Sequence, residues 1–297
     1  MVTNIMRFTQ QIRQQQALGL MVRVGSLLEA EAWIDVSSET STPLMIILDD
    51  RLGGALLDER VRYLAEYIEA RGAVVGIGYY SDGSEPQVRM ALLAGCSYVQ
   101  VNVIKWKSKA PEMLAYLSRL AHGMDAYLEA VVGEFRDGAW KSAFATEFDL
   151  KRLVADTRVD ALGVMVPEGV VSDWKKSGKK QLNEDFLHAS SLKTGSMLCL
   201  HGASLGSSWI PNSKVLAKHP YREVTGISEQ ALMRVSEKGI RYVVLDHDLR
   251  NIIDMAYRAG SPDSGLYDMS DLKAIYRTLI TSYLAHCNNL VAKTYAL

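Results

Sequence analysis

The sequence predicts an α/β protein that folds as a (β/α)8 TIM barrel. Short apolar runs alternate along it with amphipathic stretches of helical spacing, and the runs number eight. The length of 297 residues suffices for such a barrel, which needs about 250. No low-complexity linker divides the chain, so we expect a single domain over 1–297. A doubly wound open sheet is the structural alternative.

The expected strands are too short to be helices and are rich in β-branched or aromatic residues, as buried parallel strands are. They cover residues 20–24, 44–48, 74–79, 98–101, 126–132, 161–166, 197–200 and 242–245. Their spacing of about 30 residues matches one strand and one helix per repeat.

The expected helices lie between these runs. Apolar residues recur at helical spacing over 56–68, and Gly72 follows as a stop signal. The pattern returns at 90–93, 113–120 and 231–235. A C-terminal helical extension is expected over 268–297. Its apolar face would serve either as the last barrel helix or as an oligomer contact.

Composition excludes several classes of function. With 33 Lys+Arg against 34 Asp+Glu, the chain has no basic field for nucleic acid, and the lysine-rich stretch 175–180 is too short to change that. No apolar run approaches the length of about 18 residues that a membrane span needs. We expect no nucleic acid and no membrane among its partners.

Cysteine usage and the N-terminus point to the cytoplasm. Cys96, Cys199 and Cys287 are far apart, which argues against a disulfide framework or a cysteine zinc site and favours buried free thiols. No signal peptide is visible. We expect a soluble cytoplasmic protein that forms a homo-oligomer or, if it is not catalytic, accompanies a partner enzyme.

The ends of the expected strands carry many polar residues, and in a barrel the chemistry lies at the carboxyl ends of the strands. These residues are Asp49, Asp50, Asp82, Asn102, Lys105, Glu168, His201, Asp246 and His247. Such acids and imidazoles suit a metal ion or a phosphorylated substrate. The alternative for Asp49, Asp82 and Asp246 is that each is a helix N-cap.

Two further charged residues are singled out by their positions. Glu129 lies between Leu128 and Ala130 inside an apolar strand, where a carboxylate is costly unless it is paired. Lys105 would form a Schiff base if it were desolvated, but a solvated loop lysine is the favoured interpretation.

Residues 201–204 form a candidate phosphate cradle. Gly202 and Ala203 are small enough for backbone N–H groups to approach an anion, and Ser204 adds a hydroxyl. Asp246 and His247, at the neighbouring strand end, would add further backbone N–H groups. The expected ligand is therefore a small phosphorylated metabolite.

Several segments, taken in order, resemble the class II, metal-dependent fructose-bisphosphate aldolases. LLAGCSYVQVN, YLEAVVG and DALGV look like the fourth, fifth and sixth strands of that family, and LHGAS resembles its phosphate and metal loop. Residues 226–250 resemble its last repeat. The resemblance implies a barrel fold, a divalent metal and a phosphorylated sugar as substrate.

The departures from the family pattern lie at the chemically important positions. Ser81 occupies the place of the acid/base aspartate, and Asp82 that of a zinc histidine. The stretch around Glu168 lacks the second zinc histidine, and only His201 matches a family ligand. Serine has no useful pKa for this proton transfer. The resemblance therefore implies a divergent member, not a standard zinc fructose-bisphosphate aldolase.

Two functions follow as hypotheses. The first is a carbon–carbon lyase acting on a phosphorylated sugar or a related carbonyl compound. Asp82, Glu168 and His201 would hold Mn, Fe, Mg or Zn, and Asp50, Asp82, Glu129 or His247 would transfer protons. Asn102 and the cradle would bind the substrate. The second hypothesis is a non-catalytic binding or scaffold subunit with the same fold.

Overall fold

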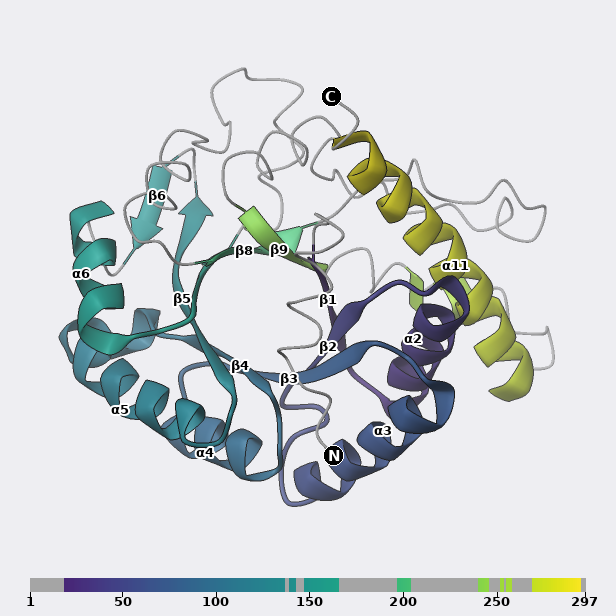
Figure 1. Cartoon of the computed structure of the whole chain (residues 1–297), viewed down its shortest axis with the longest axis horizontal. Coiled ribbons are helices and arrows are strands. Elements are labelled where there is room, and N and C mark those ends of the chain that lie inside the picture. The colour runs from purple at the N-terminus through teal and green to yellow at the C-terminus, as the bar shows by residue number, and fades with distance from the viewer. Residues whose placement is uncertain are drawn as a thin grey trace.

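Eight parallel strands close into a barrel with helices outside it (Figure 1). The computed structural model describes residues 19–136, 139–142, 147–165, 197–203, 240–245, 252–253, 255–257 and 269–294. The barrel strands are β1 (Gly19–Val24), β2 (Leu44–Leu48), β3 (Val75–Ser81), β4 (Tyr98–Asn102), β5 (Tyr127–Arg136), β7 (Ala161–Met165), β8 (Met197–Ala203) and β9 (Ile240–Leu245). Because β9 pairs with β1, the ring is closed. The (β/α)8 prediction is confirmed, and the open sheet is wrong.

One strand lies outside this ring. β6 (Ala139–Ser142) pairs antiparallel with the last residues of β5, and the two form a ribbon beyond the barrel. This ribbon was not predicted, because its few residues show no clean alternation of apolar and polar side chains.

The helices cover the outer face of the strands. They are α2 (Leu27–Thr40), α3 (Leu57–Arg71), α4 (Glu85–Leu93), the 3-10 helix η1 (Ile104–Lys109), α5 (Ala110–His122), α6 (Glu147–Thr157) and α11 (Met269–Thr294). The helices expected at 56–68, 90–93 and 113–120 are confirmed, while 231–235 lies outside the described residues. No helix in the described parts of the chain is long and apolar enough to cross a membrane.

The helix starts differ from the expected caps. The N-cap of α3 is Leu56, and Asp49 instead accepts hydrogen bonds from the backbone N–H and guanidinium of Arg51. The N-cap of α4 is Ser84, whose N–H donates to the hydroxyl of Ser81 at 3.0 Å. The N-cap interpretation of Asp49 and Asp82 is therefore wrong. Asp246 lies outside the described residues.

The last helix packs against the first one described. The apolar face of α11 is buried at Leu272, Leu279 and Tyr283, and α11 contacts α2 (Figure 1). Lys273 pairs with Glu31 of α2 at 2.7 Å. The face therefore serves within the chain, as part of the outer helical layer.

Apolar side chains form two separate clusters. The larger lies between strands and helices, and the smaller fills the barrel with Met21, Met45, Ile47, Tyr98, Cys199, Tyr242 and Val244. Two glycines of β3 make room for this filling. A Cβ on Gly76 would lie 2.6 Å from the Met45 methyl group, and one on Gly78 would lie 2.8 Å from the Tyr98 carbonyl oxygen.

Candidate functional site

The interior of the barrel contains polar side chains as well as apolar ones. Successive residues of a strand face opposite sides, so alternate positions point into the barrel. At the carboxyl end of the strands the inward positions include Arg23, Tyr80 and Asn102, all half-buried. One step further in, Gln100 and Glu129 are fully buried. The polar layer therefore lies just beneath the end of the barrel where chemistry is expected.

A carboxylate–imidazole pair is the centre of this layer. His201 Nε2, on β8, contacts Glu129 Oε1, on β5, and the two side chains are 1% and 0% exposed. The second oxygen, Glu129 Oε2, accepts hydrogen bonds from Tyr98 Oη at 2.6 Å and from Gln100 Nε2 at 3.1 Å. The structure thus supplies the partners that a carboxylate in an apolar strand requires.

These contacts decide the charge of Glu129. Burial by itself raises the pKa of Glu129, but the positive charge that His201 carries whenever it is protonated, with the hydrogen bonds from His201, Tyr98 and Gln100, brings this pKa below its ordinary value of 4.5. Burial, followed by the nearby charge of Glu129, raises the pKa of the Cys199 thiol well above its usual range. The site therefore holds a carboxylate beside a neutral thiol.

The two ring nitrogens of His201 differ in their contacts. His201 Nδ1 is buried and has no hydrogen-bond partner among the residues that the structure describes. When Nε2–H donates to Glu129, the neutral ring carries its lone pair on Nδ1. A carboxylate that fixes the imidazole in this way leaves the opposite nitrogen ready to accept a proton.

Gly163 on β7 provides the space for this pair. A Cβ at this position would overlap Glu129 Oε1 and would lie 2.8 Å from His201 Nε2. β7 lies between β5 and β8, and Gly163 pairs in register with Cys199. A glycine inside the expected strand 161–166 was a signal of such a close approach, which the sequence analysis missed.

The donors near His201 do not have the spacing of metal ligands. Ligand atoms of Glu129, Cys199 and His201 lie within 4.8 Å of one another. Two ligands at about 2.0–2.1 Å from one tetrahedral ion must themselves be about 3.3 Å apart. His201 Nε2 and Glu129 Oε1 are instead in direct hydrogen-bond contact. In this arrangement the three donors do not fit a shared metal ion.

The predicted metal ligands are only partly described. Asp82 is exposed in the turn before α4, whereas His201 is buried and its Nε2 contacts Glu129. Glu168 lies outside the described residues, so the set Asp82, Glu168 and His201 stays a prediction.

The predicted acid Asp50 is exposed. Its Oδ1 accepts hydrogen bonds from Tyr79 Oη at 2.8 Å and from Gln87 Nε2 at 2.9 Å. This links the end of β2 to β3 and α4. Asn102 donates to Tyr80 Oη at 3.5 Å and accepts from the backbone N–H of Ile104 at 3.1 Å.

The predicted phosphate cradle is described only at its beginning. Gly202 adopts a left-handed conformation with φ of 71°, and the β8–β9 register shifts between Leu200 and Ala203. Ser204, Asp246 and His247 lie outside the described residues. The cradle stays a prediction, as does any role for Lys105, whose side chain is likewise not described.

Several residues that surround the pair were not predicted from the sequence. Arg23 lies over the Tyr80 ring, with Cζ 4.0 Å from the ring centroid, and Tyr98 and Gln100 bind Glu129. Arg23 and Gln100 each interrupt an apolar run, as Glu129 does. Their positions in the sequence therefore mark them for the same reason as Glu129, because a polar group inside an apolar strand needs a partner.

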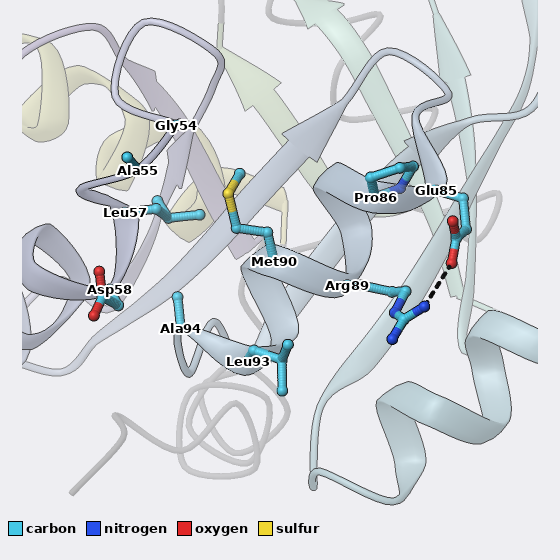
Figure 2. Close-up of a pocket in the computed structure, with 10 residues that line it drawn as sticks. All are labelled: Gly54, Ala55, Leu57, Asp58, Glu85, Pro86, Arg89, Met90, Leu93 and Ala94. Carbon is cyan, nitrogen blue, oxygen red and sulfur yellow. Dashed lines mark ion pairs between the residues drawn. The ribbon is translucent and has the colours of Figure 1, made fainter.

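A hollow of about 550 Å³ lies outside the ring of strands. Figure 2 shows it between the start of α3 and α4, with Leu57, Met90 and Leu93 on its walls and Arg89 paired to Glu85 at 3.6 Å. None of the interior polar side chains lines it. It is therefore separate from the Glu129–His201 site.

Comparisons with known proteins identify the fold. No family model matches the sequence, and no curated protein matches it significantly. Among solved structures, the chain is similar to the YdjI aldolase from Escherichia coli K12, with a TM-score of 0.72 and 14% identity over 100% of this chain and 99% of that one. It is also similar to a fructose-bisphosphate aldolase from Campylobacter jejuni, with a TM-score of 0.66 and 9% identity over 97% and 95% of the chains. The chain therefore has the barrel fold of these aldolases.

Proposed function

We propose that the protein is an aldolase-type carbon–carbon lyase in which His201, held by Glu129, transfers the proton. The substrate class is a small phosphorylated sugar or a related carbonyl compound. The observation that carries this proposal is the buried pair itself, which leaves His201 Nδ1 without a partner among the described residues, near the carboxyl end of the barrel. The aldolase fold of the structural neighbours supports the reaction class.

The reaction would proceed by general base catalysis. His201 Nδ1 takes the proton from the hydroxyl group on the carbon β to a carbonyl group. The bond between the α and β carbons then breaks, the β carbon becomes an aldehyde, and the electron pair moves onto the carbonyl oxygen as an enolate. His201 returns the proton to the α carbon, which releases the second carbonyl product. Glu129 stays ionised throughout and holds the ring.

The rest of the predicted site would serve binding. Gly202, Ala203 and Ser204, with Asp246 and His247, would hold the phosphate group through backbone N–H groups. Asp50, Asp82 and Asn102 remain candidates for substrate contacts at the rim. Because His201 is 1% exposed, substrate reaches Nδ1 only when the side chains that cover it move aside.

The second candidate function is a non-catalytic aldolase-fold subunit. Burial of the pair favours it, because each member of a closed carboxylate–imidazole pair is needed to keep the other from being buried unpaired, whether or not the pair does chemistry. The two functions differ in whether a carbonyl compound loses its α proton in the presence of the protein.

The deciding experiment is hydrogen exchange into a carbonyl compound. The protein is incubated in D2O with dihydroxyacetone phosphate or with unphosphorylated dihydroxyacetone, and deuterium at the α carbon is followed by NMR. We expect exchange with the wild-type protein and a loss of about 10²- to 10⁴-fold in His201→Asn, the range for a general base.

The matched control is His122→Asn. His122 also contacts a carboxylate, Asp160, at 3.0 Å, but this pair lies at the opposite end of the barrel. Exchange should be unchanged in this variant. A folded wild-type protein that exchanges neither compound is the outcome that the non-catalytic function predicts, and it would remove the lyase proposal.

A further inference from the structure

We infer that Arg23 binds the enolate oxygens formed in the reaction, and that the substrate therefore carries a second oxygen on the carbon next to its carbonyl group. This inference deepens the lyase function proposed above and rests on it. It names a residue of β1 that lies outside every segment resembling the aldolase family. It also narrows the substrate class to α-hydroxyketones and α-ketoacids.

The position of Arg23 brings a permanent positive charge into the barrel. Arg23 follows Met21 by two residues, so both side chains face the interior, and Met21 belongs to the interior cluster. Met21 Sδ also accepts a hydrogen bond from Gln100 Nε2, which itself binds Glu129. Among the interior side chains that the structure describes, Arg23 is the one that is positively charged at every physiological pH.

The guanidinium is held in place before any ligand arrives. Arg23 Cζ lies 4.0 Å from the centre of the Tyr80 ring, and the Tyr80 hydroxyl is in turn within 3.5 Å of Asn102 Nδ2. Two guanidinium nitrogens, Nε and Nη2, are buried. A cation fixed by an aromatic ring in a site that excludes water is the arrangement that stabilises charge in a transition state.

The side of the barrel that carries Arg23 is joined to the reacting end of the site. Gln100 Nε2 donates both to Met21 Sδ, two residues before Arg23, and to Glu129 Oε2, and Glu129 contacts His201. Cleavage places one negative charge on the carbonyl oxygen close to His201. An enolate in such a dry environment requires a compensating positive charge.

The geometry of a guanidinium selects the substrate class. Its N–H groups form a planar fork that binds two oxygen atoms side by side. The enolate of an α-hydroxyketone or an α-ketoacid presents two such oxygens on neighbouring carbons, whereas a simple ketone presents one. Arg23 would therefore favour the first two classes over the third.

The test uses oxalate, a planar dianion that resembles such an enolate. Its binding to the wild-type protein is measured by calorimetry at constant ionic strength, beside inorganic phosphate. We expect oxalate to bind more tightly than phosphate. Its affinity should fall about 10- to 100-fold in Arg23→Gln, the range for a hydrogen bond to a charged group. Arg23→Lys keeps the charge without the fork and should bind with intermediate affinity.

Two controls separate this inference from the proposed function. Arg51→Gln removes an exposed arginine near the carboxyl end of β2, paired with Asp49 at 2.7 Å, and should leave oxalate binding unchanged. His201→Asn should lose proton exchange but keep oxalate binding. Proton exchange therefore tests the lyase function, and oxalate binding tests the anion site, independently of each other.

The contrary outcomes are equally defined. Equal oxalate affinity in the wild-type protein and in folded Arg23→Gln would overturn the inference, and so would the absence of oxalate binding to the wild-type protein. Phosphate binding that is tighter than oxalate and depends on Arg23 would make the residue a phosphate ligand and overturn the enolate assignment. If Arg23→Gln does not fold, the test rests on Arg23→Lys. Unchanged oxalate affinity in that variant would overturn the claim that the planar guanidinium binds the two oxygens.

Discussion

Two carboxylate–imidazole pairs in the described part of the chain differ almost only in their surroundings. Glu129 and His201 meet inside the barrel, where their side chains are 0% and 1% exposed. Asp160 and His122 meet at the amino ends of the strands, where the side chains are 21% and 39% exposed. The same two chemical groups therefore lie in nearly dry and in wet environments within one protein.

The difference shows what burial adds to an ion pair. Asp160 accepts a hydrogen bond from the backbone N–H of Leu128 at 2.8 Å, which joins the start of β5 to the residue before β7. Water solvates the rest of that pair, so the pair contributes little. The Glu129 side chain is not exposed to water, so it depends on Tyr98 and Gln100 for its remaining hydrogen bonds. The interior pair is therefore far more sensitive to the loss of one member.

Removing one interior partner should have the largest effect. Glu129→Ala leaves His201 and Tyr98 buried without their acceptor, and we expect a loss of about 3–5 kcal/mol in the free energy of unfolding. His122→Ala, the matched change at the exposed pair, should cost about 0–1 kcal/mol. Urea unfolding followed by circular dichroism measures both.

A double variant sharpens this result. Glu129→Met combined with His201→Leu replaces both members by apolar residues, so no charge is left unpaired. We expect it to recover most of the stability lost in Glu129→Ala, while proton exchange stays absent. A double variant as unstable as the single one would show that the pair's charges matter less than its shape.

The space beside the interior pair gives the next largest effect. Gly163→Ala places a methyl group against Glu129 and His201, and overpacking of this kind costs about 1–3 kcal/mol. Gly76→Ala also creates a close contact, but with the flexible end of Met45, which can move. We expect a smaller loss there. Equal thermal stability of the two variants would show that the pair adjusts as easily as a methionine does.

Acid should destabilise the protein through the interior pair, by less than the substitutions above. The pKa of Glu129 is lowered in the folded protein, so its contribution to stability is present above the ordinary value of 4.5 and is lost as pH falls through the folded-state value. Urea unfolding between pH 6 and 3 should therefore show a steeper loss for the wild-type protein than for the Glu129→Met/His201→Leu variant. Parallel curves would mean that Glu129 does not contribute to the acid sensitivity.

Added metal should not bind the donors of the interior pair. Because His201 Nε2 is taken by Glu129, we expect any rise in the thermal midpoint with Zn²⁺ or Co²⁺ to be the same in the wild-type protein and in Cys199→Ser. A rise in the midpoint that disappears in Cys199→Ser would contradict this expectation and would place an ion on the interior donors.

The fold was largely predictable because buried parallel strands are marked by their own residues. All eight apolar runs became barrel strands. α2 was missed because Trp33, Ile34 and Val36 are consecutive or nearly so and all buried, which removes the one-sided pattern of a surface helix. β6 was missed because its pairing depends on the unusual length of β5, which is a property of the folded sheet.

The site was predictable only in part. Glu129 stood out because a charge inside an apolar strand needs a partner, and that partner is His201. The pairing itself could not be read from the sequence, because the two residues are 72 positions apart and meet through the register of β5, β7 and β8. The N-caps were predicted wrongly because Asp49 bonds Arg51, two residues away, in preference to a helix end.

The contact between the two ends of the ring has a consequence for synthesis on the ribosome. β1 is covered by β9, and Lys273 and Arg277 of α11 pair with Glu31 and Asp35 of α2. At about 5–20 residues per second, the ribosome needs roughly ten seconds to a minute to synthesise the more than 200 residues that follow β1. Through that interval β1 presents an unpaired strand edge, which favours wrong pairing. The free edge of β1 is therefore open to wrong pairing until β9 is made and pairs with it.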